Sequence, residues 1–241
     1  MRQGMDGSIV QASRLRKVFH GASEVEALRG IDMEVGRGEM VAIVGPSGSG
    51  KTTLLNCLSG LDGFDGGQVS VDGQDLAKLS DRQRTAYRRK NMGFVFQAFN
   101  LLPVLSAVEN VEIPLLLQGV GSAAARRRAL EMLETLGLAH RANHRPDQLS
   151  GGEQQRVAVA RALVHQPAVV WADEPTGNLD TEVTQVIVEL LVRMNKQGQT
   201  IVLVTHNPQV AERAARIMRM RDGRFEQPGQ ADRTVLRAAG R

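Results

Sequence analysis

The sequence predicts an α/β protein with an aliphatic core and a helical insertion near the middle of the chain. Hydrophobic residues make up 42% of its 241 residues and aromatic residues only 3%, a balance typical of aliphatic α/β cores and unlike that of all-β sandwiches. A glycine-rich segment joins an aliphatic run to a helix-forming run at residues 40–56. From residue 98 to about residue 143 the spacing of apolar residues becomes helical. The length suits one domain that carries a subdomain.

The composition also excludes several classes of protein. The single cysteine, Cys57, rules out a disulfide within the chain, and its position favours a small buried hydrophobe over a redox thiol. No apolar run approaches the ~18 residues of a membrane-spanning helix, and the first residues lack the apolar core of a signal peptide, so we expect a chain that neither spans nor crosses a membrane. The net charge of +4 comes mostly from scattered arginines, and no basic run is interleaved with aromatic residues. A solvated surface is therefore favoured over nucleic-acid binding.

Two strands are predicted near the start of the chain, at residues 9–19 and 28–35, before a turn at residues 36–39. Phe19 ends the first strand and is one of the few aromatic residues before the glycine-rich loop. Two interpretations of Phe19 stay open: a core phenylalanine, or a platform on which an adenine stacks. Stacking of a base on an aromatic ring contributes about 1–3 kcal/mol.

The segment from Met40 to Asn56 carries the strongest signal. An aliphatic strand ends at Val44, and the loop GPSGSGKT that follows has the G-x-x-x-x-G-K-[ST] spacing, before a helix predicted to reach about Gly60. The glycines let successive backbone N–H groups turn inward into a concave anion site, to which the helix N-terminus adds partial positive charge. A purely structural turn is the alternative. The expected polyphosphate contacts are Gly45, Pro46, Ser47, Gly48, Ser49, Gly50, Lys51, Thr52 and Thr53, of which Lys51 brings a full charge and Thr52 a hydroxyl that can bind magnesium.

The next predicted elements lead to a polar residue at a strand end. Alternating valines before an Asp-Gly turn predict a hairpin over residues 63–76. Ser80 and Gln83 have the spacing of a capping box and open a charged helix, after which residues 93–96 are predicted to form a strand. Gln97 follows that strand. A polar residue there is ordinary, so Gln97 taken alone is a weak candidate for a ligand contact.

The helical insertion contains a second capping box, at Ser106 and Glu109, and a helix predicted at residues 122–137. No long linker, low-complexity tract or repeat separates it from the rest, so we interpret it as a subdomain that faces a partner. Five apolar residues at its entrance are candidates for that contact, with core packing as the open alternative: Phe99, Leu101, Leu102, Val104 and Leu105.

A second anion-binding helix N-terminus is predicted at LSGGEQQR, residues 149–156. Ser150 and Glu153 form a third capping box, and Gly151 and Gly152 fall in the first helical turn. An ordinary glycine-containing cap is the alternative, and it would suit a protein with one phosphate site. The surplus site therefore requires an explanation.

Two adjacent carboxylates follow a short apolar strand at residues 168–172. Open α/β sheets bind ligands at the carboxyl ends of their strands. Because neighbouring strand residues face opposite ways, we expect Asp173 to approach a magnesium ion and Glu174 to point toward an attacking water as its base. Taken alone, such a pair would more often be a solvated turn. A loop then runs to Asp180, and a helix is predicted from about Thr181.

The last strong strand is predicted at residues 200–205, and His206 follows it. A lone histidine in a loop is usually structural, but this position makes His206 a candidate for donating a hydrogen bond to a γ-phosphate. A final hairpin is predicted over residues 217–225, and residues 226–241 are predicted to form a flexible polar tail.

Together these segments resemble the nucleotide-binding subunit of an ATP-binding cassette (ABC) transporter over residues 9–225. The motifs that carry the resemblance are GPSGSGKT as the Walker A loop, LSGGEQQR as the signature motif, VVWADE as Walker B, TGNLD as the D-loop, Gln97 as the Q-loop glutamine and His206 as the switch histidine. FQAFNLLPVLSAVENVEIPL and ADEPTGNLD further resemble the branch of macrolide-export, lipoprotein-release and cell-division subunits. Two departures are Phe19, where the family commonly has tyrosine, and Trp171, which interrupts an otherwise aliphatic strand.

The resemblance implies one ABC ATPase domain over residues 1–241. Residues 9–97 and 151–225 would form a P-loop NTPase (RecA-like) core with an N-terminal antiparallel β subdomain, and residues 98–150 an α-helical subdomain with the signature motif at its end. It also implies a magnesium-dependent ATPase whose catalytic residues are Glu174, His206 and Gln97. Adenine would stack on Phe19, and Mg²⁺ would be organised by Thr52, Gln97 and Asp173.

The resemblance further implies a head-to-tail dimer, in which ATP lies between the phosphate loop of one copy and Ser150, Gly151, Gly152, Glu153 and Asp180 of the other. The helical subdomain would contact an integral membrane permease, and the subunit would lie peripherally on the cytoplasmic face of the inner membrane, with no nucleic-acid partner. Two alternatives stay open: a soluble cassette ATPase acting in translation or DNA repair, and a cell-division cassette that signals without moving a substrate. The cargo would be determined by the permease.

Overall fold

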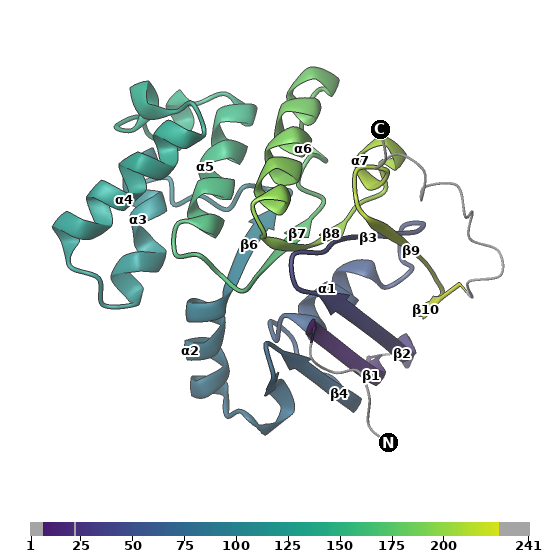
Figure 1. The fold of residues 1–241 in the computed structure, drawn as a ribbon. Coiled ribbons are helices and arrows are strands. Elements are labelled where there is room, and N and C mark those ends of the chain that lie inside the picture. Colours follow the sequence, from purple (N-terminus) through teal and green to yellow (C-terminus); the bar gives the residue numbers. More distant parts are fainter. Residues whose placement is uncertain (1–6, 22, 227–241) are drawn as a thin grey trace.

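The computed structural model describes residues 7–21 and 23–226, which fold around two β-sheets (Figure 1). The larger sheet is built from β3 (Met40–Val44), β6 (Met92–Phe96), β7 (Val169–Asp173), β8 (Thr200–Val204), β9 (Arg216–Arg221) and β10 (Arg224–Phe225). Its strand order is β10-β9-β3-β8-β7-β6, and every pairing except that of β10 with β9 is parallel. The parallel strands therefore place the loops at their carboxyl ends along one edge of the sheet.

Alternate residues of the central strands enter two separate hydrophobic cores. In β8, Val202 and Val204 pack on the side that holds helix α1 (Lys51–Leu58), whereas Ile201 and Leu203 pack on the side of α5 (Gly151–Leu163) and α6 (Thr181–Lys196). All residues of β8 are buried, as expected for a parallel strand covered on both faces. Each fully buried aliphatic side chain contributes about 1.5–3 kcal/mol, so these cores hold the sheet that carries the site.

The smaller sheet is antiparallel and lies beside α1, in the order β2-β1-β4-β5. Its strands are β1 (Ser8–Phe19), β2 (Val25–Gly36), β4 (Gly66–Val71) and β5 (Gln74–Asp75). The predicted hairpin over residues 63–76 is confirmed by the pairing of β4 with β5. The pairing of β4 with β1 was not predicted, because it joins segments that are far apart in the sequence.

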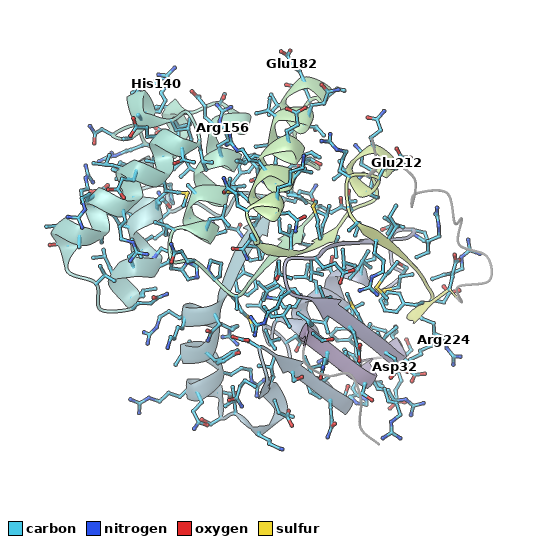
Figure 2. All side chains as sticks on the ribbon, in the orientation of Figure 1. Asp32, His140, Arg156, Glu182, Glu212 and Arg224 are labelled. Atoms are coloured by element: carbon cyan, nitrogen blue, oxygen red, sulfur yellow. The ribbon has the colours of Figure 1, made fainter. Side chains whose placement is uncertain are left out.

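The remaining helices are α2 (Asp81–Asn91), α3 (Ala107–Leu117), α4 (Ser122–Thr135) and α7 (Pro208–Ala211), with 3₁₀ turns at Leu76–Lys78, Ala139–Arg141 and Pro146–Gln148. Figure 1 shows α3 and α4 together beside α5, at one side of the larger sheet. All three predicted capping boxes are confirmed, with reciprocal bonds at the starts of α2, α3 and α5. Polar side chains such as those of His140, Glu182 and Arg224 are exposed on the outside of these elements (Figure 2).

The helical pattern expected from residue 98 begins later, at α3. Before that helix the chain makes a turn in which Phe99 and Asn100 have left-handed backbone angles, with φ of 58° and 51°. Two consecutive non-glycine residues in this region cannot continue a right-handed helix, because each costs roughly 1–2 kcal/mol. The turn therefore separates β6 from the helical insertion.

No helix within the described part of the chain is long and apolar enough to span a membrane. The predicted hairpin over residues 217–225 is confirmed by β9 and β10, and β9 also pairs with β3 as part of the larger sheet. The predicted tail at residues 226–241 lies, apart from Glu226, outside the described residues.

Candidate nucleotide-binding site

The glycine-rich loop connects β3 to α1 in a shape that only glycine permits at two positions. A Cβ atom on Gly45 would lie 2.1 Å from the backbone oxygen of Met220, so no side chain fits there. Gly50 has a φ of 100°, in the left-handed region that glycine adopts without strain. The Nζ of Lys51 lies 2.9 Å from the carbonyl oxygens of both Gly45 and Pro46, so the ammonium closes the loop upon itself.

The N-terminus of α1 is available to an anion. Its cap residue is Gly50, which supplies no side-chain hydrogen bond, and its first turn contains no acidic residue. The backbone N–H groups of that turn therefore have no side-chain acceptor among the described residues, and the helix dipole adds partial positive charge. Ser49 differs from the exposed residues of the loop because it is only 2% exposed, and its backbone oxygen accepts from the N–H of Gly223 over 3.0 Å.

A cleft of about 790 Å³ opens above this helix end, within the size range of small-ligand sites. Its lining brings together nine of the predicted site residues from four parts of the chain: Phe19, Ser47, Gly48, Gly50, Lys51, Thr52, Thr53, Glu174 and His206. Gly45 and Pro46 line a neighbouring pocket that His206 also borders. The sequence therefore identified most of the residues that surround this cleft.

Phe19 lies at the edge of the cleft and is 45% exposed, so the interpretation as a core phenylalanine is wrong. The ammonium of Lys17 lies 5.1 Å from the centre of the Phe19 ring, which is a cation–π distance. Lys17 is itself held by the carboxylate of Asp62, at 3.1 Å. Lys17 thus holds the Phe19 ring in place, and the ring remains accessible to solvent.

The two expected oxygen ligands for magnesium from β7 and α1 touch each other. The hydroxyl of Thr52 donates to Oδ1 of Asp173 over 3.2 Å. Burial raises the pKa of Asp173 and the neighbouring Glu174 raises it further, although the hydrogen bond from Thr52 acts in the opposite direction. A divalent cation would relieve this unfavourable burial of negative charge. Hydroxyl and carboxylate oxygens suit Mg²⁺, which commonly binds through one or two carboxylates together with substrate phosphates.

Glu174 and His206 form a direct pair. Nδ1 of His206 lies 2.8 Å from Oε1 of Glu174, and the backbone N–H of His206 donates to Oε2 over 3.3 Å. The predicted reason for the orientation of Glu174 is wrong, because β7 ends at Asp173 and Glu174 has a left-handed φ of 45°. The turn, rather than strand alternation, directs the two carboxylates apart. The pairing itself was not predicted, since it joins the ends of two different strands.

Gln97 is exposed, and although it is not among the residues that line the cleft, its side chain is held by the loop after β7. Its Nε2 donates to Oδ1 of Asn178 over 3.1 Å, and Nδ2 of Asn178 donates to the backbone oxygen of Gln97 over 3.1 Å. Sequence reasoning placed Asn178 in the loop but gave it no role. Nothing local marks this pair, because 81 positions separate its members.

The capping box at the second predicted anion site, the start of α5, is fully formed. Ser150 Oγ accepts from the backbone N–H of Glu153, and Oε2 of Glu153 accepts from the N–H of Ser150, at 3.3 and 2.8 Å. The backbone hydrogen bond from Ser150 lowers the pKa of Glu153, and the nearby Arg141, 3.1 Å from Oε1, acts in the same direction. Both oxygens of Glu153 are thus engaged within the chain.

The glycines of this segment differ in their surroundings. A Cβ on Gly152 would lie 2.5 Å from a methyl group of Val183, so the start of α6 packs closely here. Gly151 has room, since the nearest atom to its Cβ would be 3.5 Å away. Asp180 caps α6 by accepting from the N–H of Val183 over 2.8 Å. The described residues that line the cleft include none of Ser150, Gly151, Gly152, Glu153 and Asp180.

Two contacts of α5 were missed by sequence reasoning. The buried Gln155 donates through Nε2 to the backbone oxygen of Pro175, in the loop after β7. The guanidinium of Arg161 donates to the backbone oxygens of Phe99, at 2.8 Å, and Asn100. Burial lowers the pKa of Arg161. Both side chains bind backbone oxygens, and such contacts leave no pattern in a sequence.

Comparisons with known proteins agree with this geometry. The family model described as ABC transporter matches residues 28–177. The chain is 50% identical over 206 residues to an ABC transporter ATP-binding protein of Thermotoga maritima, covering 86% of this chain and 88% of the relative. It is 48% identical over 223 residues to the lipoprotein-releasing system ATP-binding protein LolD of Pseudoalteromonas translucida, covering 92% and 96%.

Among solved structures, a similar fold occurs in a dimeric ATP-binding cassette in a post-hydrolysis state, bound to ADP and Pi. That cassette is 43% identical in sequence and superposes with a TM-score of 0.84, over 90% of this chain and 97% of the other. Its bound ADP and Pi are the products that an ATPase site would hold.

Proposed function

The chain belongs to the ABC transporter family as an ATP-hydrolysing subunit, and from this premise we propose a role for each residue of the site and an arrangement of its partners. The single observation that carries the proposal is that the glycine-capped N-terminus of α1 lines the cleft, whereas the second glycine-containing helix N-terminus, at Ser150, does not. The phosphate loop surrounds one cleft, and the helix start at Ser150 belongs to another surface.

We assign nucleotide binding to the cleft around α1. Phe19 stacks on the adenine, Lys51 and the backbone N–H groups of the loop hold the phosphates, and Thr52, Asp173 and Gln97 hold Mg²⁺. When bound, Mg²⁺ neutralises charge on the phosphate oxygens. Lys51 must leave the carbonyl oxygens that it now binds in order to reach the phosphates. The exposed ring of Phe19 and the raised pKa of Asp173 support these roles.

We assign the general base to Glu174. Its carboxylate accepts the proton of the attacking water, while the backbone N–H of His206 holds one carboxylate oxygen in place. The imidazole of His206 lies against the other oxygen and can donate to a γ-phosphate once it turns. The left-handed turn at Glu174 supports this assignment, because strained backbone is common where a catalytic side chain must be directed.

The two anion sites form a composite site between two copies of the chain in a head-to-tail dimer. ATP lies between the phosphate loop of one copy and residues 150–153 with Asp180 of the other. The dimeric state of the similar cassette supports this arrangement. ATP closes the dimer because the γ-phosphate adds contacts that exist only in the closed state, and hydrolysis removes them.

Residues 98–150 act as the helical subdomain, and residues 9–97 with 151–225 as the core of the domain. The subdomain contacts an integral membrane permease at the cytoplasmic face of the inner membrane. Its entrance supports this role only in part: Leu102 and Val104 are 47% and 73% exposed, whereas Leu101 packs against the core. The side chain of Asn110 holds this loop, accepting from the N–H of Leu102 over 2.8 Å and donating to its oxygen.

Mixing two inactive variants tests the composite site. Lys51→Ala removes the phosphate ligand, and Gly151→Asp adds a carboxylate where there is room for it and where a helix N-terminus tolerates it. In a head-to-tail dimer of either variant alone, both sites carry the substitution. In a mixed dimer, one site carries both substitutions and the other combines the two unchanged halves, so that this second site is intact. Random pairing restores about a quarter of the wild-type sites. If each chain holds its own complete site, mixing restores no ATPase activity.

Co-purification tests the partner. Extraction of membranes with detergent is expected to recover the chain with an integral membrane protein, and Leu102→Asp with Val104→Asp is expected to reduce that recovery. Recovery with ribosomes or DNA instead would favour a soluble cassette ATPase.

A further inference from the structure

We propose that Asn178 is a positioning residue, which presents the carbonyl oxygen of Gln97 to the magnesium ion; this inference rests on the metal role proposed for Gln97. The two residues follow neighbouring strands of the larger sheet, since Phe96 of β6 is paired with Asp173 of β7. Their loops therefore leave the sheet side by side. Each loop contributes one amide side chain to the contact.

The polarity of the hydrogen bonds fixes the orientation of both amides. The backbone oxygen of Gln97 can only accept, so the group of Asn178 that faces it, at 3.1 Å, must be the NH₂ group. The other end of the Asn178 amide is then its oxygen, which requires a donor. The donor is the NH₂ group of Gln97, also at 3.1 Å. Oε1 of Gln97 accepts no hydrogen bond from the described residues, and it is the atom that a cation can bind.

The glycine before Asn178 brings the amide of Gln97 this close. A Cβ on Gly177 would lie 2.7 Å from Nε2 and 2.9 Å from Cδ of Gln97, so the side chain lies directly against the backbone of the loop. The N–H of Gly177 in turn donates to the backbone oxygen of Glu174 over 3.0 Å. One short turn therefore carries both the general base and the residue that orients Gln97.

Without Asn178, the Gln97 amide would have no fixed orientation. Rotation of its terminal group would point NH₂ at the cation as readily as oxygen, and an NH₂ group cannot act as a ligand. The hydrogen bond from Nε2 of Gln97 to Asn178 opposes that rotation, and the bond from Asn178 to the backbone oxygen of Gln97 holds Asn178 in place; both are lost when Asn178 is replaced. Their loss is expected to raise the Mg²⁺ concentration needed for nucleotide binding by about 3- to 10-fold. A merely structural role for Asn178 would change thermal stability and leave this concentration unchanged.

The experiment measures binding of a fluorescent ATP analogue to the full chain as Mg²⁺ is titrated, together with the midpoint of thermal unfolding. Asn178→Ala is compared with Gln97→Ala and with the double variant. We expect both single variants to raise the half-saturating Mg²⁺ concentration, and the double variant to match Gln97→Ala alone. The matched control is Asn195→Ala, because the Asn195 side chain likewise takes part in two hydrogen bonds, here donating to two backbone oxygens at the opposite end of α6. This control should lower the unfolding midpoint without changing the Mg²⁺ dependence.

The outcomes separate this inference from the function that it rests on. If Gln97→Ala leaves the Mg²⁺ dependence unchanged, the metal role of Gln97 fails and the inference falls with it. If Gln97→Ala changes the dependence and Asn178→Ala does not, the inference alone is overturned. A double variant that is weaker than Gln97→Ala would also overturn it, because Asn178 would then act by a route other than Gln97.

Discussion

Replacing Glu174 by glutamine removes a proton acceptor while keeping the shape of the site. A glutamine at this position can still accept from the backbone N–H of His206 and can donate to its Nδ1, the two contacts that the carboxylate makes at 3.3 and 2.8 Å. The variant is therefore expected to fold, to bind ATP and to accumulate as a closed dimer, because the γ-phosphate that closes the site is no longer removed.

The expected loss of turnover follows from comparing two effects. A positioned general base contributes about 10²- to 10⁴-fold, or about 3–5 kcal/mol of activation free energy. If the substitution only weakened the two bonds from His206, at about 1 kcal/mol each, turnover would fall roughly 30-fold at most. A larger loss therefore identifies Glu174 as the base.

The assay is phosphate release at saturating Mg²⁺-ATP, with nucleotide affinity measured separately and the dimer followed by size-exclusion chromatography in ATP. Glu189→Gln on the exposed face of α6 is the control, with the same chemical change away from the cleft. Turnover of the Glu174→Gln variant within about tenfold of wild type would refute the assignment, since that range lies below the contribution of a general base.

Three other experiments test the surrounding structure. Asp173→Asn should raise the free energy of unfolding of the nucleotide-free protein by about 1 kcal/mol. The gain should grow as pH rises above 3.8, because a carboxyl whose pKa is raised in the folded state destabilises the fold as it ionises. Chemical unfolding between pH 4 and 8 measures this dependence. Gly45→Ala should lower the free energy of unfolding by about 3 kcal/mol or more, because its Cβ would meet a backbone oxygen of β9 at 2.1 Å. Gly48→Ala should lower it by only about 1 kcal/mol, because there is open space around Gly48. Equal losses for the two variants in urea unfolding would contradict this prediction. Burial raises the pKa of Cys57 to about 12. A thiol reagent at pH 8 should therefore react with Cys57 at least ~100-fold faster in the unfolded than in the native protein. Rapid labelling of the native protein would count against the packing of α1.

Patterns that depend on near neighbours predicted their structure well. A capping box needs only two side chains three positions apart, and all three that the sequence predicted are formed. The aliphatic runs of β3, β7 and β8 likewise predicted buried strands, because their side chains face cores on both sides of the sheet. The phosphate loop was found for the same reason, since its glycines and Lys51 lie within eight consecutive residues.

Contacts between distant segments were predicted less well. The pair of Gln97 with Asn178 and the pair of Glu174 with His206 each join loops from neighbouring strands, and only the order of strands in the sheet brings them together. Strand alternation gave the wrong reason for the direction of Glu174, because alternation requires an extended backbone at Glu174 and that residue has a left-handed φ. For Phe19, the sequence did not distinguish the two interpretations, and the exposure of the ring excludes only the core interpretation.

The turn at Phe99 and Asn100 affects which nearby residues can change during evolution. Arg161 donates hydrogen bonds to the backbone oxygens of these two residues and not to their side chains. Its planar guanidinium reaches both oxygens at once, which the single ammonium of lysine would not do in the same geometry. Because these hydrogen bonds use no side chain of Phe99 or Asn100, a substitution at either position can keep them as long as the new residue accepts a left-handed backbone. The exposed Leu102 and Val104 just beyond the turn can therefore change, as a different partner in the proposed permease contact would require, while the turn keeps its shape.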